Sequence, residues 1–112
     1  MRAIVAIIKP HKLDDVTEAL HQAGIQGMTI TEVRGHGRQR GHTEVYRGAE
    51  YEVEFIPKLR LDVVVDDADA ETVAAAIAAA GQTGKIGDGK IWITNVDTVI
   101  RIRTGERDHD AI

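Results

Sequence analysis

Residues 58–65 read KLRLDVVV, and apolar and charged side chains alternate along this stretch. Leucine or valine occupies every odd-numbered position, whereas Lys58, Arg60 and Asp62 occupy even-numbered ones. Successive side chains of a β-strand point to opposite faces of the sheet. The pattern therefore predicts a strand over residues 58–65 that is covered on the face with the odd-numbered side chains.

Five further elements are expected around this strand from apolar spacing, β-branched content and glycine or proline boundaries. They are strands at residues 2–9 and 28–35, helices at 13–23 and 66–81, the second with an aspartate cap, and an extended segment at 91–103, either continuous or bent near Asp97 into two short strands. This order predicts an α+β, ferredoxin-like split βαβ fold, with two helices on one face of an antiparallel sheet and a long loop between strands two and three. The other face would be bare, so we expect a homo-oligomer, with dimer and trimer both open.

The composition indicates one folded domain and excludes several classes of function. A chain of 112 residues suits a single core, and a net charge of −4 argues against nucleic acid bound through bulk positive charge. Cysteine and serine are both absent, which excludes disulfides, thiolate metal sites and serine or cysteine nucleophiles. The apolar run at residues 3–8 is too short to span a membrane, so we expect a cytoplasmic protein.

Residues 81–90, GQTGKIGDGK, contain four glycines and two lysines. Glycine allows positive φ and close backbone approach, so the stretch is typical of a nest of N–H groups that binds phosphate. It also fits part of a Walker A loop, but Ile91 stands where Ser or Thr should bind Mg²⁺, which excludes a P-loop. An ordinary flexible connection is the alternative.

Residues 100–107, IRIRTGER, place Arg101 and Arg103 two positions apart. On an extended segment both side chains would point to the same face, where two guanidinium groups could hold a polyphosphate. A solvated strand face is the alternative, because exposed like charges repel only weakly. Arg38 could bring a third cation to the same anion.

Three stretches together carry a resemblance: TEVRGHGRQRGHTEVYRGAEYEVEFIPKLRLDVVV (31–65), QTGKIGDGKIWI (82–93) and VIRIRTGE (99–106). In them the chain resembles the PII nitrogen-regulatory signal proteins. The resemblance implies a single signalling domain over residues 1–112, with a T-loop at 36–56, a glycine-rich phosphate loop at 82–90 and a C-terminal segment at 101–112. It also implies a homotrimer with ATP or ADP sites in the clefts between neighbouring subunits.

The resemblance further implies which residues bind the effectors ATP or ADP, Mg²⁺ and 2-oxoglutarate. The nucleotide residues would be Thr29, Gly37, Arg38, Gln39, Val64, Gly87, Asp88, Gly89, Lys90, Arg101, Ile102 and Arg103. The 2-oxoglutarate residues would be Gln39, Arg40, Gly41, Lys58 and Gly87. Gln39 would also be the one protein ligand of Mg²⁺, with phosphate and 2-oxoglutarate oxygens completing the coordination.

The implied function is non-enzymatic: a sensor that regulates nitrogen assimilation by binding ammonium channels, enzymes or regulators through its T-loop. Arg47 would dock into an ammonium channel, so the membrane is reached only through that partner, and a nucleotidylyltransferase would modify Tyr51. One alternative is a nucleotide-dependent phosphotransferase that uses one of the five histidines. An RNA-recognition module is disfavoured, because Phe55 is the only phenylalanine and the strands lack paired aromatic residues.

Overall fold

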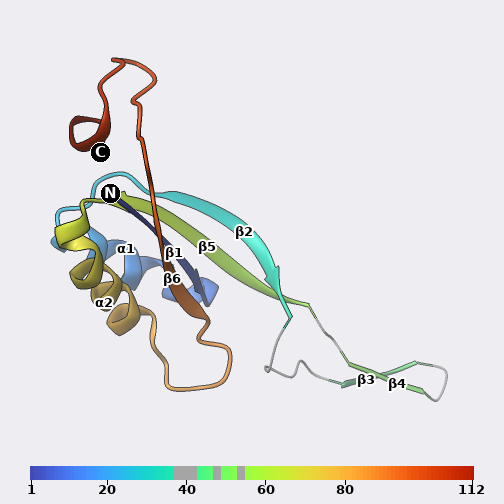
Figure 1. Ribbon diagram of the computed structural model, residues 1–112. Coiled ribbons are helices and arrows are strands. Elements are labelled where there is room, and N and C mark those ends of the chain that lie inside the picture. Colours follow the sequence, from blue (N-terminus) through green and yellow to red (C-terminus); the bar gives the residue numbers. More distant parts are fainter. Residues whose placement is uncertain (37–42, 47–48, 53–54) are drawn as a thin grey trace.

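The computed structural model describes residues 1–36, 43–46, 49–52 and 55–112, and it gives 43–46 and 49–52 through their backbone alone. Four strands form one sheet in the order β2-β5-β1-β6: β1 (Arg2–Ile8), β2 (Thr29–Gly35), β5 (Ile56–Val65) and β6 (Lys90–Asn95). All neighbouring strands are antiparallel. The helices α1 (Leu13–Gln22) and α2 (Ala70–Gly81) both lie on one face (Figure 1). The predicted ferredoxin-like α+β fold is confirmed.

The core lies between this sheet face and the two helices. β1 is a central strand, and its Ile4 stands opposite Val63 of β5 and Ile93 of β6. The buried side chains come from both layers: Ile4, Ala6, Ile8, Leu61, Val63 and Val65 from the sheet, and Val16, Leu20, Val73 and Ile77 from the helices. The odd-numbered residues of β5 therefore face the core, as their alternation predicts.

The helix boundaries follow local chain chemistry, with one exception. α1 ends next to Gly24, whose φ of +84° is the left-handed conformation typical of a helix C-terminus. At the start of α2, Asp69 makes no side-chain cap hydrogen bond, so the predicted aspartate cap is wrong. The acidic run instead forms a short 3₁₀ helix, η2 (Asp67–Asp69), immediately before α2.

We call the sheet face turned away from the helices the open face. Register places Arg60, Asp62 and Val64 of β5 there, beside Ile7, Val5 and Ala3 of β1. Trp92 of β6 lies on the same face, 38% exposed, with the Arg60 guanidinium carbon 5.9 Å from its ring centroid. The helices leave this face uncovered, as predicted.

Two segments differ from the expected secondary structure. The long loop contains a separate antiparallel pair, β3 (Thr43–Tyr46) and β4 (Ala49–Glu52). At the other segment, β6 ends at Asn95, the chain bends at Asp97, and Ile100 makes an isolated bridge to Arg107. The expected bend near Asp97 is confirmed, but residues 102–104 form a turn, so the prediction of extended chain through Arg103 is wrong. The short 3₁₀ helices η1 (Pro10–Lys12) and η3 (Asp108–Ala111) complete the described elements.

Candidate functional site

The glycine loop, residues 82–90, connects α2 to β6 and is closed by the carboxylate of one of its own residues. Asp88 Oδ2 accepts hydrogen bonds from the backbone N–H groups of Thr83 and Gly84, each at 2.9 Å. Asp88 Oδ1 accepts the hydroxyl of Thr83. Part of the predicted anion nest is therefore filled from within, because this carboxylate takes two of its amide donors.

Lys9 reaches the same carboxylate from the end of β1. Its Nζ lies 2.9 Å from Thr83 Oγ1 and 3.3 Å from Asp88 Oδ1, and the lysine side chain is 14% exposed. The Thr83 hydroxyl, the amides of Thr83 and Gly84, and Lys9 hold the pKa of Asp88 well below its usual range. Asp88 is therefore ionised at neutral pH. The sequence analysis assigned no role to Lys9, which lies in no motif, or to Thr83, which lies in the glycine-rich stretch but is neither a glycine nor a cation.

Glycine is required at two positions on either side of Asp88. Gly87 and Gly89 have φ values of +96° and +86°. A Cβ on Gly89 would lie 1.9 Å from the carbonyl oxygen of Ile7, so the loop passes directly against β1. Among the described residues, the N–H groups of Ile86 and Gly87 have no backbone or side-chain acceptor. These amides are the part of the nest that an external anion could use.

Lys58 joins the loop to β5. Although it was predicted on the polar face of the strand, it is only 7% exposed, and its Nζ donates to the carbonyl oxygen of Gly87 at 2.5 Å. Burial, and then the nearby charge of Lys9, lower the pKa of Lys58. Its side chain also lines a groove of about 580 Å³ together with residues from η1, β2 and β5. A buried ammonium group at a groove suits a carboxylate ligand.

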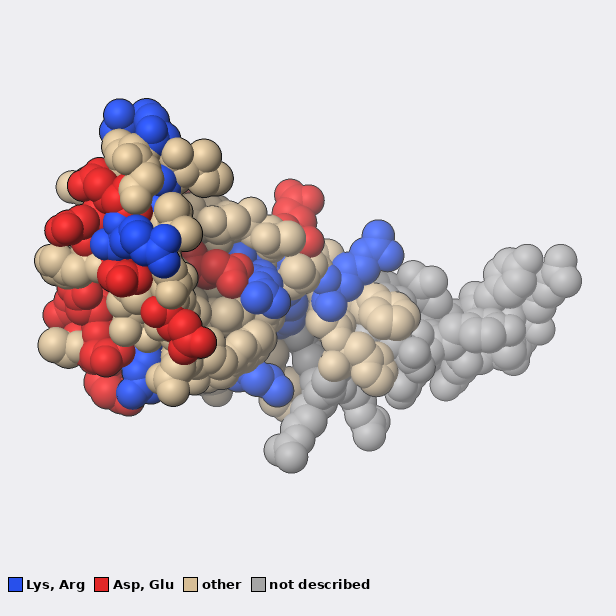
Figure 2. Space-filling model, turned by 45° about the horizontal axis from the view of Figure 1, so that its top comes forward, with Lys and Arg blue, Asp and Glu red and all other residues tan. Residues whose placement is uncertain are grey.

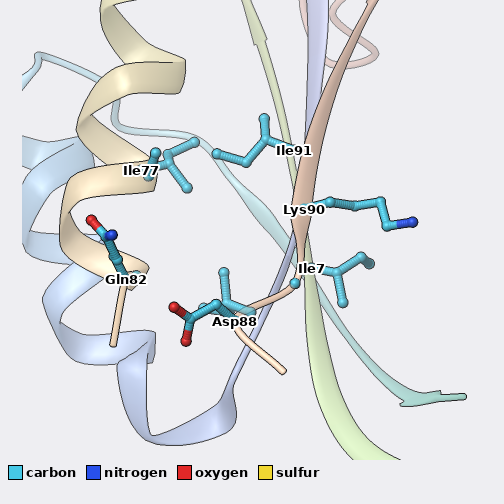
Figure 3. Close-up of a pocket in the computed structure, with 10 residues that line it drawn as sticks. Ile7, Ile77, Gln82, Asp88, Lys90 and Ile91 are labelled. Carbon is cyan, nitrogen blue, oxygen red and sulfur yellow. The ribbon is translucent and has the colours of Figure 1, made fainter. Parts of the chain in front are cut away.

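Lys90 and Asp88 point to opposite sides of the sheet. Figure 3 shows Asp88 at a cavity of about 450 Å³ beneath the C-terminal end of α2, where Ile77 and Ile91 point toward one another. Lys90 points away from this cavity, on the side of Ile7. Four of the ten lining residues are isoleucines, and the one lysine among them, Lys90, turns its side chain away, so the cavity offers little to a phosphate ligand. Lys58 and Lys90 instead lie on the open face, beside the glycine loop.

The predicted nucleotide residues fall into two groups. Lys90 and the residues Gly87, Asp88 and Gly89 lie near Lys58, and we call them the loop group. The other predicted residues are Thr29, Val64 and Arg101–Arg103, and we call them together the tail group. Register places Thr29 opposite Asp62 and Val64 opposite Ala3, toward the other end of the sheet, and the segment 101–103 lies beyond that end (Figure 1). Lys58 and Val64 are six residues apart on β5, which corresponds to about 20 Å. The structure does not bring the two groups together within one chain.

A turn sets the conformation of the segment Arg101–Arg103. Gly105 N donates to Arg101 O at 2.8 Å, and Arg101 N donates to Glu106 O at 2.9 Å. The Arg101 guanidinium contacts the Glu106 carboxylate at 3.2 Å and the Ile112 carbonyl at 3.4 Å. The predicted alignment of Arg101 and Arg103 on a strand face is therefore wrong, since a turn separates them. Ile102 is fully exposed.

Charge is distributed unevenly over the surface. Figure 2 shows Asp and Glu gathered mainly on the side of the helices, with some Lys and Arg among them, and further Lys and Arg toward the sheet. The acidic residues include Asp14 and Asp15 at the start of α1 and Asp67 and Asp69 before α2.

Comparison with known proteins shows the family of this chain. Residues 1–106 match the family model for nitrogen regulatory protein P-II. The chain belongs to the P-II family. It is 62% identical to the nitrogen regulatory protein P-II of Rhizobium meliloti (strain 1021), 59% identical to that of Azospirillum brasilense, and 61% identical to nitrogen regulatory protein P-II 1 of Escherichia coli (strain K12). Each match covers all of both chains. Membership of this family supports a signalling role in nitrogen regulation.

Several predicted P-II site residues lie outside the described residues: Gly37, Arg38, Gln39, Arg40, Gly41 and Arg47. The Tyr51 backbone stands opposite Glu44 in the β3–β4 pair. At the base of this segment, the rings of His36 and Phe55 are 5.8 Å apart. In the described part of this P-II chain, His, Asp and Glu side chains form no group of three that could hold a metal ion. None of the described helices is long and apolar enough to cross a membrane.

Proposed function

We propose that this P-II protein is a non-enzymatic, cytoplasmic sensor of ATP or ADP and of 2-oxoglutarate. Three copies would assemble, and a nucleotide would occupy each cleft between neighbours. The output would be regulation of nitrogen assimilation through ammonium channels, enzymes or regulators that contact the segment at residues 36–56. The family membership supports the regulatory role, and the distribution of the site residues supports the assembly.

The separation of the loop group from the tail group is the observation that carries this proposal. A nucleotide held by Gly87 and Lys90 of one chain cannot also reach Arg101 of the same chain, since about 20 Å of strand separates the two ends. A second copy can bring its own tail group to the loop group of the first. The site is then complete only at an interface between copies.

The open face offers a surface for that assembly. Trp92 and the half-buried Val64 are apolar side chains on it, flanked by the ion pair between Arg60 and Asp62 at 3.0 Å. An uncovered sheet face with an exposed tryptophan is typical of a buried interface between subunits. A homotrimer would cover this face and align loop and tail groups of neighbouring chains.

The described residues fit a magnesium ion whose oxygen ligands come mainly from the bound nucleotide and 2-oxoglutarate. Asp88, the only carboxylate of the glycine loop, already accepts two amides and a hydroxyl, so it has little capacity left for a cation. Nucleotide phosphates, the Gln39 side chain and 2-oxoglutarate would supply the hard oxygen ligands that Mg²⁺ prefers. Lys58 would hold the distal carboxylate of 2-oxoglutarate. Because the metal would bridge both ligands, they should bind cooperatively.

The protein contacts would be made by the segment that contains β3 and β4. Arg47 would dock into an ammonium channel, which is the only route by which this chain would reach a membrane. Tyr51 would be the site at which a nucleotidylyltransferase attaches a nucleotide, adding bulk and negative charge to this surface. Ligand contacts at the base of the segment would select among its conformations.

Isothermal titration calorimetry tests the sensor function directly. We expect 2-oxoglutarate to bind the protein in the presence of Mg²⁺ and ATP at least tenfold more tightly than in the absence of ATP, with ADP giving a smaller effect. Equal affinity with and without ATP would refute the proposed coupling. Sedimentation of the unmodified chain tests the assembly, and we expect a trimer. A monomer at micromolar concentration would refute it, because the loop group of each chain would then lack the tail group of a neighbour.

A further inference from the structure

We propose that Asp88, Thr83 and Lys9 form an internal clamp that sets the shape of the glycine loop before nucleotide binds. In this role Asp88 and Lys9 are positioning residues, and they act on the nucleotide through the backbone of the loop. The inference rests on the proposed nucleotide site and deepens it, since it assigns a role to two residues, Lys9 and Thr83, outside the predicted binding set.

The hydrogen bonds of the clamp close the loop on itself. The Asp88 carboxylate receives the amides of Thr83 and Gly84 on one oxygen, and the Thr83 hydroxyl on the other. Thr83 Oγ1 also accepts the backbone N–H of Lys85 at 3.2 Å. Four of the six residues from 83 to 88 are thereby tied together. A glycine-rich loop without such ties would be free to adopt many conformations.

Lys9 joins the clamp to the sheet and balances its charge. The Nζ of Lys9 contacts both Thr83 and Asp88, and its chain position directly after β1 fixes it to a central strand. A lone carboxylate in this loop would repel a polyphosphate at close range. Because the Lys9 ammonium group lies 3.3 Å from Asp88 Oδ1, the clamp orders the loop without presenting an unbalanced negative charge.

The clamp also leaves two kinds of amide donor in the loop, those bonded to Asp88 and those still available to a ligand. Asp88 takes the N–H groups of Thr83 and Gly84, whereas those of Ile86 and Gly87 have no acceptor among the described residues. On the far side of the loop, Lys58 holds the Gly87 carbonyl oxygen. The loop is thus fixed at both sides, with the Ile86 and Gly87 donors left for an external anion. Binding then costs less ordering than it would with a mobile loop.

Nucleotide affinity measures this effect. If losing the clamp reduces the loop's competent conformation to about one tenth of the molecules, apparent affinity falls about tenfold. Calorimetric titration with MgATP should therefore show a roughly tenfold weaker Kd for Asp88→Ala and Thr83→Val. Thr83→Ser keeps the hydroxyl and should bind like the unmodified protein. Asp15→Asn is the matched control, because it removes an exposed carboxylate of α1 that pairs with Lys12.

Hydrogen exchange of the ligand-free protein provides a second readout. The amides of Thr83 and Gly84 should exchange faster in Asp88→Ala, with core amides of β1 unchanged, because only the two donors lose their acceptor. The clamp proposal would be refuted, with the proposed function left standing, by either of two results. One is unchanged exchange at these amides, and the other is an MgATP affinity of Asp88→Ala equal to that of the unmodified protein. Failure of Thr83→Ser to restore affinity would also overturn the clamp. Failure of the unmodified protein to bind MgATP would instead overturn the proposed function together with the clamp.

Discussion

Replacement of Gly89 by alanine should destabilise this protein far more than the same change at Gly84. Both glycines have positive φ, +86° and +80°, so alanine at either position pays the left-handed backbone penalty of about 1 kcal/mol. The surroundings differ. A Cβ at Gly84 meets nothing within 4 Å, whereas a Cβ at Gly89 lies 1.9 Å from Ile7 O and 2.8 Å from Ile7 C.

The excess cost at Gly89 comes from the backbone of a central strand. Real Cβ atoms essentially never approach closer than 3.0 Å, so the loop and β1 must separate where Ile7 stands opposite Lys90. Losing about two ladder hydrogen bonds there, at about 1 kcal/mol each, brings the total to about 3 kcal/mol. For a domain of this size each kcal/mol shifts Tm by about 4–6 °C, so we expect a fall of roughly 12–18 °C. Gly84→Ala should lower Tm by about 5 °C.

Thermal denaturation followed by circular dichroism, at one protein concentration and without nucleotide, gives the comparison. The two variants share the backbone penalty, so the difference between their Tm values measures the steric contact with Ile7. Melting temperatures for Gly89→Ala and Gly84→Ala within two or three degrees of each other would refute the reasoning, because the steric part would then be absent.

Three further outcomes are expected. Ile77→Ala, which empties a fully buried position on α2, should cost about 2–5 kcal/mol in urea unfolding; a cost below about 1 kcal/mol would contradict this packing. The hydrogen bond and charge of Asp66, 2.8 Å away, raise the pKa of His109, so the contact stabilises the fold below about pH 6.5 and fades as pH rises through the higher folded-state pKa. As pH rises above 6.5, the Tm of the unmodified protein should therefore fall relative to the Tm of His109→Gln. If Tm changed with pH in the same way in both proteins, the contact between His109 and Asp66 would not stabilise the fold. Trp92→Ala on the open face should weaken self-association in sedimentation while the circular dichroism spectrum stays native; unchanged association would place the interface elsewhere.

The fold was predictable because its strands and helices carry strong local patterns. The alternation of apolar and charged side chains over residues 58–65 predicts which side of β5 is covered, and the order of strands and helices predicts the sheet topology. Hydrophobicity alone does not mark the end of β6, because apolar residues continue to Ile102 although strand pairing stops at Asn95; the bend at Asp97 was one of the two forms expected for this segment. Gly105, which follows the turn at residues 102–104, has a φ of +75°.

The sequence predicted the backbone character of the glycine loop but not its contacts. Glycine content pointed to an anion nest, and Gly87 and Gly89 do have positive φ. The sequence could not reveal that Asp88 fills half of that nest, since the contact depends on how the loop folds back to Thr83. It could not reveal Lys9 either, because 74 residues separate Lys9 from Thr83 and only the sheet brings them together.

The distance between the loop group and the tail group has a genetic consequence. In a three-membered ring, each chain would donate a loop to one neighbour and a tail to the other. Two defective alleles, one altered at Lys90 and one at Arg101, would each abolish every site when expressed alone. Co-expressed, they would form mixed rings in which one junction joins an intact loop to an intact tail. Such a pair of alleles should complement each other, whereas two alleles altered in the same group should not.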